Sequence, residues 1–209
     1  MRSALTFLLL VILSGCGVVR SSAGMVPEWT RDWRQVATEH DRERLRDWRK
    51  SFTDALAAAR TSGHSAEIAK EGALLDPDAA LGGGPIPNAT YACRVIKLGA
   101  KSQGMLDYVS YAPFVCRIGQ ERDLQGFAKL TGSQRPVGLI FPGDVMRQVF
   151  LGTLVLGDER EARQYGQDET RDTAGYVERI GPNRWRLVMP APAFESQLDV
   201  IELIPGGVR

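Results

Sequence analysis

Gly181-Pro182-Asn183-Arg184-Trp185-Arg186-Leu187-Val188-Met189, residues 181–189, is the stretch that decides the fold. Its first three residues favour a tight turn between two β-rich runs, which predicts an antiparallel hairpin. Trp185, Leu187 and Met189 alternate with Arg184 and Arg186. Because side chains of a strand point alternately to its two faces, this strand is predicted to have one apolar face and one solvated face.

Residues typical of β-strands also predominate in the rest of the chain from Ala89 onward. Eight runs are bounded by Gly, Pro, Asn or Asp: residues 90–98, 106–118, 124–131, 136–141, 146–156, 174–180, 184–189 and 197–204. Short consecutive strands joined mostly by tight turns predict a mainly antiparallel, up-and-down β-barrel of about eight strands over residues 88–205. A β-sandwich is the alternative.

A helical segment is predicted before the barrel, over residues 29–81. Thr38 has the N-cap spacing to an acidic residue at Asp41. An apolar stripe then recurs at helical spacing, made of Leu45, Trp48, Phe52, Ala55 or Leu56, and Ala59. Gly63 ends this helix, and Ser65 begins a short second one. The predicted fold class is therefore α+β, with an N-terminal amphipathic helix pair packed on the β-barrel.

The N-terminus carries a lipoprotein signal, Leu13-Ser14-Gly15-Cys16, behind an apolar run from Ala4 to Leu13 and the single charge of Arg2. The run has about ten residues, whereas a membrane-spanning helix needs roughly 20. Residues 1–15 are therefore predicted to be a signal peptide, with a lipid on Cys16 and a flexible tether over residues 16–28. An ordinary secretory signal that is cleaved after Ala23 is the alternative.

This signal predicts a protein of the cell envelope that faces the periplasm and is held to the membrane by its lipid. The residue after the lipidated cysteine is Gly17 rather than Asp, which indicates that the lipoprotein is sorted to the outer membrane. The chain has 26 Lys and Arg and 25 Asp and Glu, and losing Arg2 with the signal leaves 25 of each. A balanced charge and export both argue against nucleic acid as a partner.

Cys93 and Cys116 remain once Cys16 carries the lipid. An even number of cysteines in an oxidising compartment suggests a disulfide. Both cysteines are flanked by apolar residues at alternate positions, so two antiparallel neighbouring strands would bring the sulfurs together. Two buried free thiols are the alternative, and a catalytic thiol is a third interpretation that no neighbouring histidine supports.

One polar segment, residues 129–138, combines two cations with hydrogen-bonding side chains between two expected strands. We take Lys129, Ser133, Gln134 and Arg135 as candidate ligand-binding residues, because such a loop at the barrel mouth would suit an anionic group. The alternative is a turn whose polar residues bond to their own backbone.

Motifs for catalysis are not found: the chain has no G-x-S-x-G, H-E-x-x-H or C-x-x-C pattern. His40 and His64 lie apart from any nucleophile pattern. The acidic residues of 157–172 would suit a cation or a carboxylate pair, but arginines are interleaved with them. We therefore predict no catalytic residue, no metal and no cofactor, while enzyme activity remains open.

Several stretches resemble DUF4893, a family of alphaproteobacterial envelope proteins. They are residues 67–75, 93–99, 129–138, 150–153 and 194–203, and the resemblance runs from Trp33 to Leu203. It implies a secreted or lipid-anchored protein and assigns no catalytic residue. A looser similarity, from the lipid anchor, Tyr91-Ala92-Cys93 and the second cysteine, is to small β-barrel inhibitor lipoproteins of lysozyme or protease.

The sequence therefore favours a non-catalytic binding or inhibitor-type module that takes an envelope protein or a small molecule. The alternatives are an envelope hydrolase that uses carboxylates and an assembly factor without a ligand pocket.

The Cys16→Ala variant tests the predicted anchor. Without the thiol no lipid can be attached, so we expect the protein to move from the membrane fraction to the soluble fraction. Immunoblotting of the two fractions measures this shift. Continued membrane association of Cys16→Ala would contradict the anchor.

Overall fold

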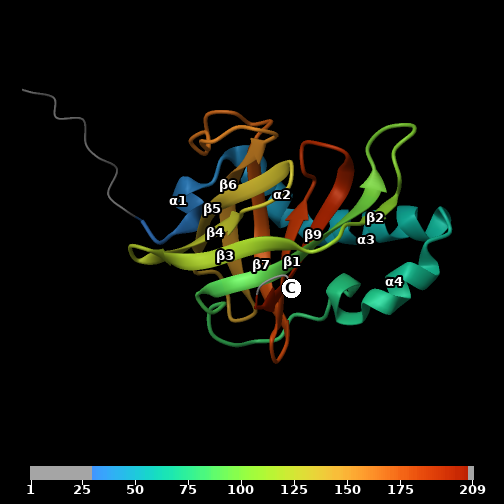
Figure 1. Cartoon of the computed structure of the whole chain (residues 1–209), viewed down its shortest axis with the longest axis horizontal. Helices are drawn as coiled ribbons and strands as arrows, with labels where there is room; N and C mark the ends of the chain where they lie inside the picture. Colours follow the sequence, from blue (N-terminus) through green and yellow to red (C-terminus); the bar gives the residue numbers. More distant parts are fainter. Residues whose placement is uncertain (1–29, 207–209) are drawn as a thin grey trace, which may run out of the picture.

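The computed structural model describes residues 30–206, so Cys16 and the predicted signal and tether lie outside the described residues. Helices come first and strands follow (Figure 1). The helices are α1 (Trp33–Val36), α2 (Glu39–Arg46), α3 (Trp48–Thr61), α4 (Ser65–Glu71) and the 3₁₀ helix η1 (Gly72–Leu75). The strands are β1 (Ala89–Ala100), β2 (Tyr108–Ser110), β3 (Phe114–Glu121), β4 (Leu124–Lys129), β5 (Gln134–Phe141), β6 (Arg147–Leu156), β7 (Asp172–Gly181), β8 (Arg184–Pro190) and β9 (Ser196–Pro205).

The strands form a closed antiparallel barrel, which confirms the predicted barrel over the sandwich. From β3 to β9 each strand pairs with the next, and β1 pairs with both β3 and β9. Eight strands thus close the ring, and β2 is an additional strand beside the second half of β1. Closure leaves no free edge in the ring itself.

One predicted strand is wrong in its extent. Residues 106–118 were expected to form one run, but the structure divides them into β2 and β3. Pro113 lies between them, and proline has no N–H for a ladder and restricts the residue before it. The chain turns there, so β2 pairs with β1 at residues 96–98 and β3 pairs with β1 at residues 89–93.

The barrel interior is filled by side chains. Its core contains Tyr91, Val95, Ile118, Phe127, Ile140, Phe150, Val177, Trp185, Leu187, Met189, Ile201 and Leu203. Cys93 and Cys116 are fully buried in the same core and form a disulfide with an S–S length of 2.05 Å. This bond joins neighbouring strands, as the alternation predicted, and it excludes the two alternatives of free thiols and a catalytic thiol. Space for a ligand is therefore found at the barrel ends.

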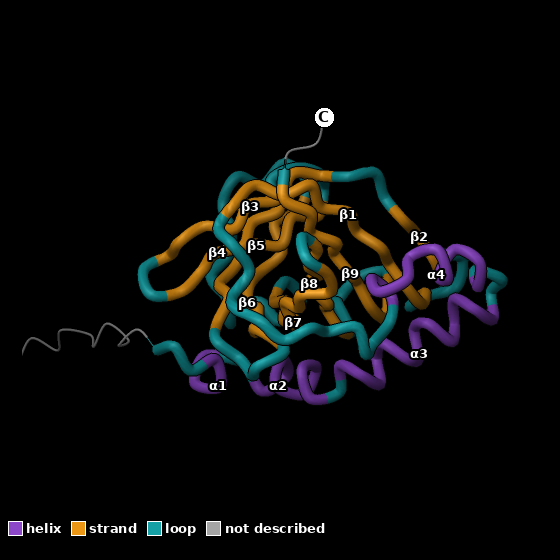
Figure 2. The backbone as a smooth tube through the Cα atoms, turned by 90° about the horizontal axis from the view of Figure 1, so that it is seen from below, coloured by secondary structure: helices purple, strands orange, loops and turns teal. Residues whose placement is uncertain are grey.

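The helices pack on one side of the barrel wall, where α1, α2 and α3 form a row and α4 lies beside α3 (Figure 2). Thr38 caps α2 as predicted, because its Oγ1 accepts a hydrogen bond from Asp41 N at 3.1 Å. The buried face of α3 is Phe52, Ala55, Leu56 and Ala59, and it packs on outward side chains of β1, β8 and β9 such as Ile96, Val188 and Val200. The predicted helix is divided at Asp47 into α2 and α3.

The outer face of β8 is not solvated as predicted, because this helical layer covers it. Arg186 has no exposed surface, and its Nη2 lies 2.6 Å from Glu178 Oε2, which is equally buried. Its Nη1 donates to the carbonyl oxygens of Ala73, Leu74 and Asp76 at 2.8–3.0 Å. The guanidinium of Arg186 thus supplies hydrogen-bond donors to carbonyl oxygens at the end of η1, which have no partner further along the helix, and joins the helices to the barrel.

Replacing Arg186 tests this junction. We expect Arg186→Met to lower the free energy of unfolding by about 3–5 kcal/mol, because it removes one partner of a buried pair and the side-chain donor that three carbonyl oxygens share. Arg184→Met is the matched control. Arg184 pairs with Glu202, but about a third of its side chain is exposed, so the expected loss in the free energy of unfolding is about 1 kcal/mol or less. Urea denaturation measures both. Equal losses would contradict a special role for Arg186.

Candidate functional site

The candidate sites lie at the two ends of the barrel, and we name each end by the segments of the chain that lie there. The mouth end carries the loops 101–107, 130–133, 157–171 and 191–195, at the top of Figure 1. The opposite end is crossed by the strap, residues 82–88, which leads from the helices into β1. Figure 2 views the barrel from this strap end.

A cavity of about 120 Å³ opens at the mouth end, and we call it the mouth cavity. Most of its wall is apolar, supplied by Val95, Tyr111, Phe114, Pro136, Leu154, Met189, Pro192, Ala193, Phe194 and Ile201. The polar part consists of Lys97, Lys129, Ser133, Gln134, Thr170, Thr173, Glu195 and Asp199. An apolar hollow with a few converging polar groups is the usual composition of a small-ligand site.

Lys97 organises the charges on one side of the mouth cavity. Its Nζ lies 2.9 Å from Asp199 Oδ2 and 3.2 Å from Glu195 Oε2. Burial lowers the pKa of Lys97, but the two carboxylates together outweigh burial and raise it. Sequence reasoning missed this residue, although its parity with Tyr91, Cys93 and Val95 places it on the inner face of β1.

Lys129 is buried on the other side with a different set of partners. Its Nζ donates to the carbonyl oxygens of Thr131 at 2.8 Å and Gln134 at 2.9 Å, and it lies 3.6 Å from the centre of the Phe114 ring. Burial lowers the pKa of Lys129 to about 8, and the nearby Arg135 and Lys97 act in the same direction. The amine is therefore a cation in an environment that disfavours its charge.

Carboxylates accompany the other buried cations but not Lys129. Within residues 30–206 the buried cations are Arg44, Lys97, Lys129 and Arg186, and ion pairs join three of them to Asp41, Asp199 and Glu178. For Lys129 no carboxylate lies within ion-pair distance in this part of the chain. A second incomplete group is Thr173, whose buried Oγ1 has no hydrogen-bond partner among the described residues. The cavity thus contains one unmatched charge and one unmatched hydroxyl.

The four residues predicted for ligand binding are only partly brought together. Lys129, Ser133 and Gln134 line the mouth cavity, and Gln134 Nε2 donates to Glu195 Oε1 at 3.1 Å. Arg135 is outside its lining. The guanidinium of Arg135 donates to the carbonyl oxygens of Gly132, Gly157 and Glu159 at 2.6–2.8 Å, which fastens two loops to each other.

The loop between β8 and β9 covers one side of the mouth cavity in a constrained conformation. Ala191 and Glu195 have φ values of 45° and 66°, in the left-handed region that residues other than glycine rarely adopt. Lys101 holds the loop through a hydrogen bond from its Nζ to Pro192 O. Such backbone strain is common beside binding sites, where it fixes a side chain in place. Here it positions Glu195 at the rim.

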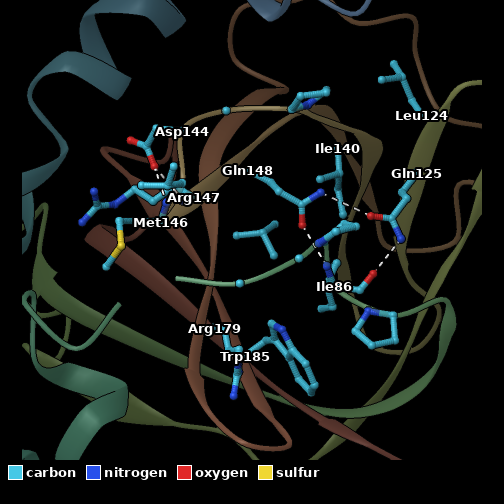
Figure 3. A pocket seen from close by; sticks show the side chains of 18 of the residues that line it. Ile86, Leu124, Gln125, Ile140, Asp144, Met146, Arg147, Gln148, Arg179 and Trp185 are labelled. Atoms are coloured by element: carbon cyan, nitrogen blue, oxygen red, sulfur yellow. Dashed lines mark hydrogen bonds between the residues drawn. The ribbon is translucent and has the colours of Figure 1, made fainter. Parts of the chain in front are cut away.

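A larger hollow, of about 580 Å³, lies at the strap end, and we call it the strap groove (Figure 3). Ile86 of the strap is buried in the barrel core, and side-chain amides hold its backbone. Ile86 N donates to Gln148 Oε1 at 2.9 Å, and Gln125 Nε2 donates to Ile86 O at 2.7 Å. Arg179 and Trp185 line another side of the groove.

The acidic residues of 157–172 do not converge on a common site. Glu159 pairs with Arg171 at 3.0 Å, and Asp168 pairs with Arg163 at 2.5 Å. Both carboxyl oxygens of Asp172 accept from Gly166 N, at 3.0 and 3.1 Å. The part of the chain that the structure describes contains no group of three or more potential metal ligands. These carboxylates stabilise the loop.

The family model described as Domain of unknown function (DUF4893) matches residues 33–203. The chain belongs to the DUF4893 family. This confirms the resemblance, and the matched region of this DUF4893 protein runs from α1 into β9 and includes the mouth cavity and most of the strap groove. Comparison with curated proteins and with solved structures found no match. Between residues 30 and 206 no helix has the length and apolarity to cross a membrane.

The titration of Lys129 tests the electrostatics of the mouth cavity. Ordinary lysines lose their proton near pH 10.4, whereas Lys129 is expected to titrate near pH 8, because burial penalises its charged form. NMR of the side-chain Nζ across this pH range measures it. A Lys129 midpoint near pH 10.4, the ordinary value for lysine, would contradict the desolvated environment.

Proposed function

We propose that this protein is a non-catalytic binding module of the cell envelope, whose mouth cavity takes a small amphipathic anion. In this proposal the lipid on Cys16 holds the barrel to the outer membrane on its periplasmic side. The observation that carries the proposal is the buried ammonium of Lys129, which has no carboxylate within ion-pair distance in residues 30–206 and lies in a mainly apolar hollow.

An anionic ligand would relieve an electrostatic cost. A buried cation without a counter-ion is unfavourable, and an anion brought beside it restores the charged form in a medium of low dielectric constant. The Nζ of Lys129 has three donors, of which two are used by carbonyl oxygens and the third faces the Phe114 ring. The ligand anion would take the place of this half-buried ring.

The shape of the cavity limits the apolar part of the ligand. A volume of 120 Å³ is somewhat smaller than that of a cavity of about 150 Å³ that holds one benzene ring. The cavity therefore suits a short aliphatic chain, either free or at the end of a larger molecule. The unpaired hydroxyl of Thr173 supplies a further hydrogen bond to a polar atom of the ligand.

Binding of butyrate tests the proposal, with 1-butanol as the neutral analogue. We expect butyrate to shift the amide signals of the mouth loops in ¹H–¹⁵N NMR spectra at pH 7, and 1-butanol to bind more weakly. Lys129→Met should weaken butyrate binding about tenfold or more, because it removes a charged partner. Above pH 8 binding should fall further with each step in pH, since free Lys129 loses its proton there.

Lys70→Met is the matched control, because Lys70 is exposed on α4 and the variant changes the net charge equally. It should bind butyrate as the parent protein does. Equal affinity for butyrate and 1-butanol, no binding of butyrate up to its solubility limit, or an unaffected Lys129→Met variant would each overturn the proposal.

A further inference from the structure

We infer that the strap groove is a docking site for a protein partner that presents a carboxylate between aliphatic side chains. This inference concerns the opposite end of the barrel from the mouth cavity and does not rest on the ligand proposed there. It follows from an unmatched guanidinium, an exposed apolar edge and a rigid floor that together border one hollow.

Arg179 supplies the charge that the groove leaves unmatched. It lies on β7 beside Trp185 of β8, which is its Cα partner in the ladder. Its Nε donates to Gly181 O at 3.0 Å, and within residues 30–206 no carboxylate lies within ion-pair distance of its guanidinium. Arginine and tryptophan are both enriched among the residues that dominate the binding energy of protein interfaces.

The remaining charges of the groove do not cancel that of Arg179. Arg147 pairs with Glu178, a carboxylate that it shares with the buried Arg186, and the carboxylate of Asp144 accepts from the N–H groups of Met146 and Arg147 at 2.8 Å. The charged side chains of the lining are three arginines, Arg31, Arg147 and Arg179, and two acids, Asp123 and Asp144, so its net charge is +1. The groove therefore favours a negatively charged group, which gives the partner its carboxylate.

An exposed apolar edge borders the same hollow. Val145, at the tip of the loop between β5 and β6, is 80 % exposed, and Leu81 and Met146 are 45 % and 36 % exposed. The strap passes close to this edge, because a Cβ on Gly82 would contact Val145 O and Met146 Sδ at 3.5 and 3.7 Å. Aliphatic side chains of the partner would cover these residues and remove them from water.

The floor of the groove is already formed. Besides the two hydrogen bonds to Ile86, Gln148 Nε2 donates to Gln125 Oε1 at 3.3 Å, and Gln125 Nε2 donates to Asn88 Oδ1 at 2.6 Å. Figure 3 shows Asp144, Met146 and Arg147 on the left, Gln148 near the centre and Gln125 on the right. Because the amides already bond to each other and to the strap, docking does not need to order them, which lowers its entropic cost.

The experiment uses three peptides as probes: acetyl-Leu-Glu-Leu-amide and the analogues with Gln or Lys in place of the Glu. Binding to the whole barrel protein is followed by NMR, through the indole N–H of Trp185 and the Nε–H of Arg179. We expect the Glu peptide to bind about tenfold or more tightly than the Gln peptide, because it alone forms a charged hydrogen bond. The Lys peptide should not bind.

Arg179→Gln should abolish this preference for Glu, while Arg117→Gln is the matched control, since Arg117 is exposed on β3 outside the groove. Circular dichroism and thermal unfolding confirm that both variants are folded. Butyrate should not compete with the Glu peptide, so failure at the mouth cavity is separable from failure here. Equal binding of the Glu and Gln peptides, or an unchanged preference in Arg179→Gln, would overturn the inference.

Discussion

The buried contact between Arg186 and Glu178 determines how the two halves of this protein fit together. Arg186 projects outward from β8 and binds two carbonyl oxygens of the 3₁₀ helix η1 and that of Asp76, which follows it. The chain then runs directly to Leu81, whose N–H donates to Arg179 O at 2.7 Å, and on into the strap. The position of the strap, and with it the strap groove, therefore follows from an ion pair in the helix–barrel interface.

The filled barrel makes its two ends different from each other. The disulfide and the aromatic core fill the middle of the barrel. Ile86, which lines the strap groove, packs into this core at one end, and the mouth cavity opens at the other. The strap end is bordered by paired amides and an exposed loop. The mouth end is bordered by buried charges and by a loop in a strained conformation. Partners of different size and chemistry suit the two ends.

Alternation and turn chemistry were sufficient to predict the architecture but not every surface. The apolar parity of Tyr91, Cys93 and Val95 predicted the inner face of β1 and the disulfide. The alternation of side chains along β8 could not show that Arg186 is buried. The outer face of β8 is covered by helices that are far away from it in the sequence. For the same reason the strap groove was missed: Arg179 and Trp185 line it together with strap residues that are far away from them in the sequence.

The burial of Lys129 needs more explanation than its turn provides. A neutral donor such as an asparagine or glutamine amide would satisfy the carbonyl oxygens of Thr131 and Gln134 without carrying a charge into the barrel. The ring of Phe114 returns about 0.5–2 kcal/mol through its contact with the ammonium. This stabilisation is of the same order as that from one neutral hydrogen bond. The desolvation of an unpaired cation costs more than one such bond contributes. The charge of Lys129 therefore exceeds what the loop requires, and the incomplete hydroxyl of Thr173 lines the same cavity.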